Sequence, residues 1–240
     1  MTCKCKDCES NSKCRWSFDI MTCCGCEATH NVDGEGCPYI MFPRKKEEAH
    51  MKINFLKIKG DWQEVKDAAM TTIGKDAGHI PSSEWKRRML LCEHSPIRKL
   101  IVKWKWSNLL WWVQTHFTRH HVGVEWHVST SRTDRTGIDR TEEGSQSNLI
   151  SVEGEANAQA IINISRKRLC MAASKETREA WLAFLAKLKR YEPELVSISV
   201  PDCIYRGHCY EYTSCGYFKT PKYKLELEKY RKGINNETIS

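Results

Sequence analysis

Residues 112–132 read WVQTHFTRHHVGVEWHVSTSR, and cationic and hydroxyl side chains are concentrated in this stretch. The stretch follows an apolar run, Leu109 to Val113, for which the sequence predicts a buried helix over residues 107–116. Cations and hydroxyls beside a buried element predict a site for an anion such as a phosphate. A solvated basic loop is the alternative, and the tryptophans within and before the stretch argue against it.

The same stretch carries a recognisable spacing of residues. Arg119-His120-His121, followed after seven residues by Ser129, resembles the signature of the flavin-dependent thymidylate synthases, which is Arg-His-Arg, seven residues, Ser. Gln114 stands where that family has a glutamine. Upstream, the segment Glu93-His94-Ser95-Pro96 resembles the family's Gly-His-x-Ser-Pro segment.

Two further segments extend the resemblance over Met51 to Lys189. Gly60-Asp61-Trp62 through Ala69 resembles the first strand–helix unit of the family. Ile162-Asn163, with Trp181 eighteen residues after Asn163, resembles the family's Asn-Ala-Arg helix and the Gln-Trp-Glu that follows it.

The resemblance implies an α/β (α+β) core that assembles as a homotetramer and holds FAD between subunits. In the family, reduced FAD delivers a hydride, methylenetetrahydrofolate delivers the one-carbon unit, and NADPH is a further cosubstrate. The family's reaction converts dUMP to dTMP, and it needs no cysteine nucleophile on the protein. The chain is therefore expected to transfer a one-carbon unit to C5 of dUMP or a related pyrimidine.

By position, the resemblance assigns two groups of residues to this site. The residues expected at the flavin or on the folate side are His94, Ser95, Arg119, His120, His121 and Asn163. The residues expected at the nucleotide are Gln114, Ser129, Thr130, Ser131 and Arg132.

The chain departs from the family pattern at several positions. His121 replaces an arginine, and an imidazole near pH 7 is neutral for much of the time. His127 stands in place of a glutamate, and Ser131 in place of an arginine, with Arg132 one position late. Ser174 stands where the family has the arginine that activates the pyrimidine.

Three arginines are candidates to replace that missing arginine. Arg178 lies one helical turn after Ser174, while Arg166 and Arg168 precede it. We take Arg178 as the catalytic candidate. If none of the three substitutes, activation of uracil as the family performs it is not expected.

Cysteines are concentrated at the two ends of the chain. Eight of the thirteen lie between Cys3 and Cys37, and three lie between Cys203 and Cys215. This clustering predicts Cys-rich extensions, residues 1–50 and 201–240, on a core of residues 51–200. The metal ligands expected in them, for zinc in the first place, are Cys3, Cys5, Cys8, Cys203, Cys209 and Cys215. An iron–sulfur cluster, reduced thiols, and buried cysteines that pack as small apolar residues are the alternatives.

Composition narrows the class of protein. The 240 residues carry a net charge of +8, which favours an anionic partner such as a nucleotide, a flavin phosphate or a nucleic acid. No apolar run approaches the ~20 residues that a membrane span needs, and the polar start lacks a signal peptide, so we expect a cytoplasmic protein without a membrane partner. The competing function is a zinc-supported nucleic-acid-binding protein that keeps the fold without the chemistry.

Periodicity predicts the elements around the motif. Strands are expected over residues 51–59 and 100–106, and helices over 62–70 and 83–92. Two helices that meet near residues 172–175 are expected within 155–189. The chain after Pro201 is expected to be rich in loops, with a frayed end or a short exposed helix after Pro221.

Overall fold

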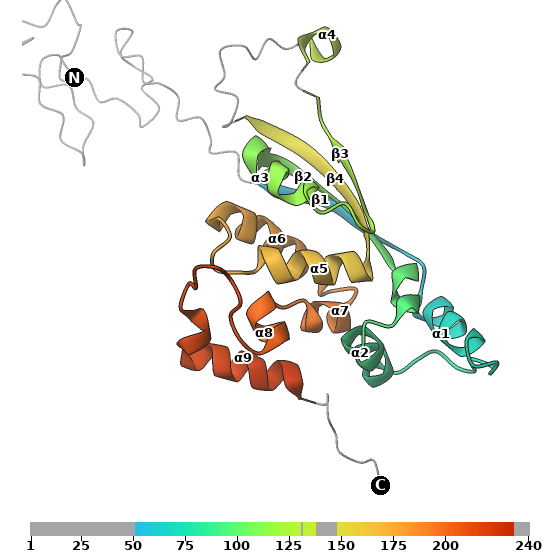
Figure 1. Ribbon diagram of the computed structural model, residues 1–240. Coiled ribbons are helices and arrows are strands. Elements are labelled where there is room, and N and C mark those ends of the chain that lie inside the picture. The colour runs from blue at the N-terminus through green and yellow to red at the C-terminus, as the bar shows by residue number, and fades with distance from the viewer. Residues whose placement is uncertain (1–50, 131, 138–147, 233–240) are drawn as a thin grey trace, which may run out of the picture. The chain divides into compact units, whose positions relative to one another are not determined.

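The computed structural model describes residues 51–130, 132–137 and 148–232. Within them, an antiparallel sheet has the strand order β1-β2-β4-β3. The strands are β1 (Lys52–Lys59), β2 (Ile101–Leu110), β3 (Val124–Val128) and β4 (Leu149–Asn157). Helices and an antiparallel sheet together confirm the expected α+β class (Figure 1). Cys3, Cys5, Cys8 and Ser131 lie outside the described residues.

One face of the sheet is buried and the other carries charges. Along β2, Val102, Trp104 and Trp106 are fully buried, whereas Lys103 between them forms a salt bridge of 2.6 Å with Glu155 of β4. This alternation follows from the two-residue period of a strand. The buried face therefore faces the helices.

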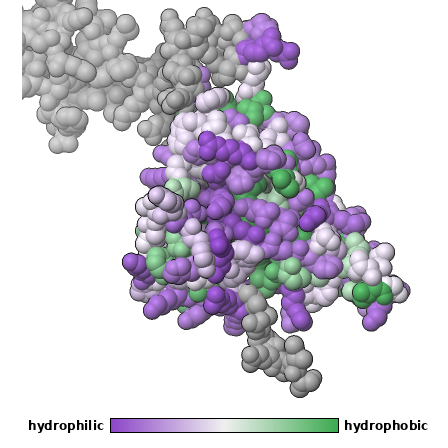
Figure 2. Space-filling model, viewed as in Figure 1, coloured by the Kyte–Doolittle hydropathy of each residue, from purple (hydrophilic) through white to green (hydrophobic). Residues whose placement is uncertain are grey.

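Helices α5 (Ala158–Arg168) and α6 (Lys175–Leu188) lie along the buried face, and α7 (Pro193–Ile198), α8 (Asp202–Arg206) and α9 (Pro221–Arg231) lie beyond them (Figure 1). Trp181 of α6 donates a hydrogen bond of 2.9 Å from Nε1 to the buried Oγ of Ser165 in α5. The ring centroid of Trp104 lies 4.4 Å from that of Phe184, so aromatic rings join sheet and helices. The space-filling view shows a mainly hydrophilic surface with small, separate apolar patches (Figure 2).

Both predicted strands and the two predicted N-terminal helices are confirmed. Helix α1 (Trp62–Thr71) begins after Asp61, whose carboxylate accepts from the backbone N–H of Glu64 at 2.9 Å. Helix α2 (Ser83–Leu91) begins after Ser82 in the same way. Gly60 precedes α1 with φ 73°, and a Cβ there would lie 2.4 Å from the carbonyl oxygen of Lys99, so only glycine fits this turn.

The prediction of a helix over residues 107–116 is wrong for the first half of that range. Ser107 to Leu110 continue β2, and helix α3 spans Trp111–Thr118. Asn108 has φ 59° and the pairing with β4 shifts between Trp106 and Leu109, after which Leu109 faces Ile150. This bulge absorbs a residue and lets the apolar run finish as strand. Apolar content alone did not distinguish the two states.

The region predicted helical from Glu155 likewise begins as strand. Glu155, Ala156 and Asn157 pair with β2, and α5 starts at Ala158. The side chain of Asn157 accepts from the backbone N–H of Ala160 at 2.9 Å and caps the helix. The second helix and the junction near residues 172–175 are confirmed by α6.

The chain after Pro201 contributes to the same core. Ile204 of α8 and Tyr223 and Tyr230 of α9 are buried within it. The helix expected after Pro221 is therefore present but only partly exposed. Short elements complete the described chain: η1 (Ser95–Lys99), α4 (Thr133–Thr136) and η2 (Tyr217–Lys219). In the part of the chain that is described, no helix is both long and apolar enough to cross a membrane.

Candidate functional site

The Arg119–His121 motif lies in the turn between α3 and β3. The backbone N–H of His120 donates to the carbonyl of Phe117 at 2.9 Å as the helix ends. Gly123 then turns the chain with φ 72°, and a Cβ there would lie 2.6 Å from the side-chain amide of Asn157. Arg119 and His121 are exposed, while His120 is half-buried. The motif therefore places two residues at the surface and one beneath them.

Arg168, at the end of α5, lies against the buried histidine. Its Nε donates to Nε2 of His120 at 2.9 Å, and its Nη2 donates to the carbonyl of His116 at 2.5 Å. Because Nε2 of His120 accepts this bond, the proton of the neutral ring is on Nδ1. We call His116, Arg119, His120 and Arg168 the histidine–arginine cluster.

Both histidines of this cluster are held neutral. Burial, with the charges of Arg168 and His121, lowers the pKa of His120 to about 4. Burial and the charges of Arg168 and Arg119 lower the pKa of His116. Burial and Arg119 also lower the pKa of Arg168 itself. The positive charge of the cluster is therefore carried by its two arginines.

No counter-charge balances these arginines within the described residues. The salt bridges found there involve other groups, and no carboxylate lies within 4.0 Å of the guanidinium of Arg119 or Arg168. Nδ1 of His116 contacts Oγ1 of Thr177 at 2.9 Å, and Thr177 accepts from Ser174 at 2.7 Å. Neutral partners thus orient the cluster and leave its charge available to an anion.

Most of the residues expected at the nucleotide lie farther along the chain, after β3. Ser129 is tied to β4, since its Oγ accepts from the backbone N–H of Ser151 at 3.0 Å. Arg132 pairs with Asp134 at 2.6 Å, and its backbone N–H donates to Oγ1 of Thr130 at 3.1 Å. Strand β3 separates Ser129, Thr130 and Arg132 from the histidine–arginine cluster. At ~3.3 Å per residue, this strand is roughly 16 Å long.

Gln114 lies on α3, closer to the motif. Its Nε2 donates to Oγ1 of Thr118 at 3.2 Å, within the same helix. Arg178, expected to be catalytic, donates from Nη1 to the carbonyls of Met171 and Ala173 at 2.9 and 2.7 Å. These contacts are with the α5–α6 turn, so the arginine that lies beside the motif is Arg168. The catalytic role of Arg178 stays a prediction.

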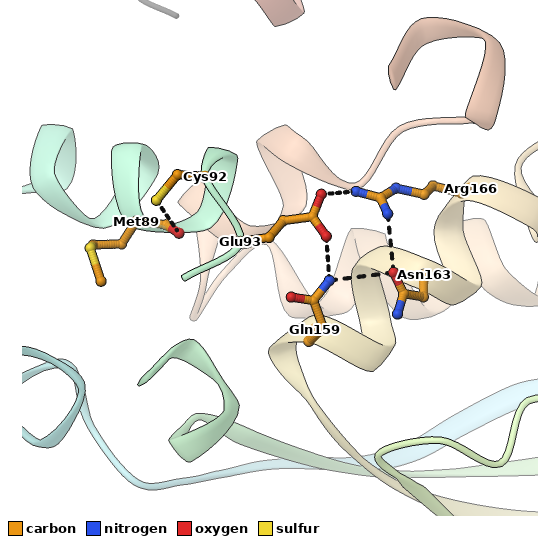
Figure 3. Close-up of polar contacts among 6 residues, drawn as sticks. All are labelled: Met89, Cys92, Glu93, Gln159, Asn163 and Arg166. Atoms are coloured by element: carbon orange, nitrogen blue, oxygen red, sulfur yellow. Dashed lines mark hydrogen bonds and ion pairs between the residues drawn. The ribbon is translucent and has the colours of Figure 1, made fainter. Parts of the chain in front are cut away.

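A second group of polar residues gathers where the turn between α2 and η1 meets α5 (Figure 3). Glu93 pairs with Nη2 of Arg166 and accepts from Nε2 of Gln159 at 2.5 Å. Nη1 of Arg166 donates to Oδ1 of Asn163 at 3.2 Å, and its guanidinium lies 3.5 Å from the ring centroid of Tyr205. We call Glu93, Gln159, Asn163 and Arg166 the glutamate–arginine cluster. Nε of Arg166 is buried and has no hydrogen-bond partner among the residues that the structure describes.

The backbone at this cluster takes a conformation that is unusual for a residue with a side chain. Glu93 has φ 51°, a left-handed conformation that glycine adopts most easily. His94 and Ser95 follow at the surface, at the start of η1.

The two clusters lie on different sides of α5. Successive residues of a helix are ~100° apart, so Arg168 is roughly 180° from Gln159 and roughly 140° from Asn163. Asn163 therefore does not join Arg119 and His120 within one chain. The sequence could not show this separation, because the resemblance assigned Asn163, Arg119 and His120 to one site by their positions in the motifs alone.

A groove opens beside the glutamate–arginine cluster. Its volume is about 820 Å³, and Tyr205, against which Arg166 stacks, forms part of its wall. The other lining residues include Trp85, Arg88 and Tyr230. Ligand pockets typically measure roughly 300–1,000 Å³, so this groove has room for a nucleotide-sized molecule.

The three C-terminal cysteines that were expected to bind metal do come together. Cys203, Cys209 and Cys215 line one cavity of about 20 Å³, and Cys170, which the sequence did not single out, lines it with them. Among the described residues, however, no group of three or more His, Cys, Asp or Glu side chains is placed so that it could hold a metal ion.

No protein-family model matches the chain, and no curated protein does. Among solved structures, it is similar to the flavin-dependent thymidylate synthase ThyX of Helicobacter pylori in complex with FAD and dUMP, with TM-score 0.49 and 13% identity over 62% of this chain and 99% of that one. A second such complex gives 0.48 and 14% over 61% and 99%. The UMP/dUMP methylase PolB of Streptomyces cacaoi, bound with 5-Br dUMP, gives 0.48 and 11% over 62% and 94%.

Proposed function

We propose that the chain is a divergent enzyme of the flavin-dependent thymidylate synthase type, which binds FAD and methylates C5 of dUMP or a related pyrimidine nucleotide. One observation carries the proposal. The motif that resembles the family signature lies at a cluster with two arginines, two neutral histidines and no neighbouring carboxylate among the described residues. Such a group of donors fits a phosphate or another anionic ligand.

The residues present fit a flavin nucleotide in their chemistry. FAD and dUMP both carry phosphate and ring oxygens that accept hydrogen bonds. Arg119 is exposed and offers a planar, charged donor, while Nδ1–H of His120 is a neutral donor fixed in one tautomer by Arg168. When bound, FAD supplies the hydride for the reaction. The chain's own residues bind, orient and polarise.

The separation of the clusters supports a site completed between subunits. Asn163 and Arg119 face different sides of α5, so one chain contributes them to two different surfaces. In a homotetramer, the histidine–arginine cluster of one subunit would meet the glutamate–arginine cluster and its groove from another. Methylenetetrahydrofolate as one-carbon donor and NADPH as reductant belong to the same proposal.

The first experiment is a visible absorption spectrum of the reduced, full-length chain, followed by titration with FAD. Flavin bands that are released on denaturation are expected. Binding of dUMP and deoxyuridine is then compared by calorimetry, and dUMP should bind at least ~10-fold more tightly because its phosphate can pair with an arginine. Arg119→Ala should weaken the binding of FAD, whereas Arg190→Ala, which removes an exposed arginine just after α6, should leave it unchanged.

A colourless protein that also fails to bind added FAD would overturn the proposal. Steeply salt-dependent binding of a polynucleotide by such a protein would instead establish the competing function, a zinc-supported nucleic-acid-binding protein. The net charge of +8 is compatible with either function, so the absorption spectrum and the FAD titration are needed to distinguish the flavoenzyme from the nucleic-acid-binding protein.

A further inference from the structure

Four cysteines from three separate segments surround one small cavity. Cys170 follows α5, Cys203 lies in α8, and Cys209 and Cys215 lie in the loop between α8 and η2. The cavity measures about 20 Å³. One water molecule needs roughly 10–15 Å³ by this measure, so the space suits a single atom or ion.

The four thiols reach this cavity from the end of α5, from α8 and from the loop that follows α8. A divalent cation placed between them would stabilise each thiolate that it binds.

The loop that carries two of these cysteines has little else to hold it. No helix or strand lies between Arg206 and Tyr217, and Gly207 and Gly216 turn the chain with φ 76° and 79°. Tyr212, midway along, is fully exposed. A metal ion bound by several thiolates supplies the folding energy that such a segment lacks from burial.

Competing ligands at the cavity are already engaged. Glu211 and Asp202 also line it, but both pair with Lys167, at 3.2 and 3.8 Å. His208, next to Cys209, makes an edge-on contact with the ring of Phe218, at 4.7 Å between ring centroids, and does not line the cavity. The donors that remain are the sulfurs, and four sulfurs in a closed site are typical of structural zinc.

We propose that Cys170, Cys203, Cys209 and Cys215 together bind one structural zinc ion. As the described residues lie, no three of these side chains could already hold a metal ion, so the proposal requires the loop to bring the sulfurs closer together on binding. The ion would join the end of α5 to α8 and to the loop that follows it. This site is independent of the proposed enzymatic function.

The test measures metal content and thiol protection in the full-length chain. Zinc per chain is determined for the wild type and for Cys170→Ser, with Cys92→Ser as the control, since Cys92 is exposed at the end of α2. Cys170→Ser should lose about one zinc per chain and Cys92→Ser none. The cysteines near the N-terminus are unchanged in both variants, so any metal that they bind cancels in the comparison.

Alkylation followed by mass spectrometry covers the case in which a variant fails to fold. In the wild type, the four cavity cysteines should resist alkylation until a chelator is added and then react together, whereas Cys92 should react at once. Equal zinc content in the wild type and Cys170→Ser overturns the proposal. So does a wild type in which the four cysteines are alkylated without chelator or are found joined as disulfides.

Discussion

Replacing Arg168 tests whether this arginine sets the protonation of the motif. In Arg168→Met, the side chain keeps most of its apolar stem but loses the donor to Nε2 of His120 and the positive charge beside it. The pKa of His120 is lowered to about 4 by burial first and by Arg168 second. Burial remains in the variant, so the pKa should rise from about 4 without reaching the ordinary value of 6.5.

The sign and size of the effect on stability follow from the same values. A histidine whose folded pKa is depressed binds fewer protons than in the unfolded chain, so it destabilises the fold as pH falls from about 6.5 to about 4. At ~1.4 kcal/mol per pKa unit, the wild type should lose at most about 3 kcal/mol of unfolding free energy over this interval. Arg168→Met should lose less, because its folded pKa is closer to the unfolded one.

The assay is a histidine NMR titration, with the His120 signal assigned by its absence in His120→Gln, together with urea unfolding at several pH values. Arg190→Met is the control for a lost surface arginine. An unchanged pKa of His120 in Arg168→Met would refute the reasoning, since Arg168 would then not hold the ring neutral. An equal pH dependence of stability in the two proteins would refute it as well.

Three further variants test the site and the core. Arg119→Ala and Asn163→Ala should each be inactive alone, but mixed tetramers should recover measurable dTMP formation if the two clusters meet between subunits; no recovery after verified subunit exchange would contradict that arrangement. Gly154→Ala should lower the unfolding free energy by roughly 1–3 kcal/mol, because its Cβ would lie 2.4 Å from the ring of Trp104, and an unchanged thermal midpoint would show that the ring can move. Arg178→Ala should cost about 1–2 kcal/mol of stability through two lost hydrogen bonds in the α5–α6 turn; a loss of turnover without a loss of stability would instead support the catalytic role predicted for it.

Local signals predicted the elements with clear caps and periodicity. The helices predicted over residues 62–70 and 83–92 follow Asp61 and Ser82, whose short acceptor side chains satisfy free backbone N–H groups at the start of each helix. Trp62, Val65 and Ala69 recur at helical spacing and form the buried face of α1. These features depend only on residues a few positions apart.

Elements that depend on distant partners were predicted less well. The end of β2 and the start of α5 were misjudged because pairing with β4 decides both. Strand β4 begins at Leu149, well before the region that was expected to be helical. An apolar or mixed segment becomes strand when a neighbouring strand accepts its backbone hydrogen bonds, and the sequence does not show that neighbour.

The sequence by itself determined the α+β class, the order of the motifs, and which residue types are available to bind an anion. Only the tertiary structure decided that Arg168 rather than Arg178 lies beside His120, that Asn163 lies on another side of α5, and that Cys170 lines the same cavity as the three C-terminal cysteines. The physical reason is that spacing along the chain defines a helix face or a turn, whereas contact between α3, α5 and the loop after α8 is set by how they pack on one sheet.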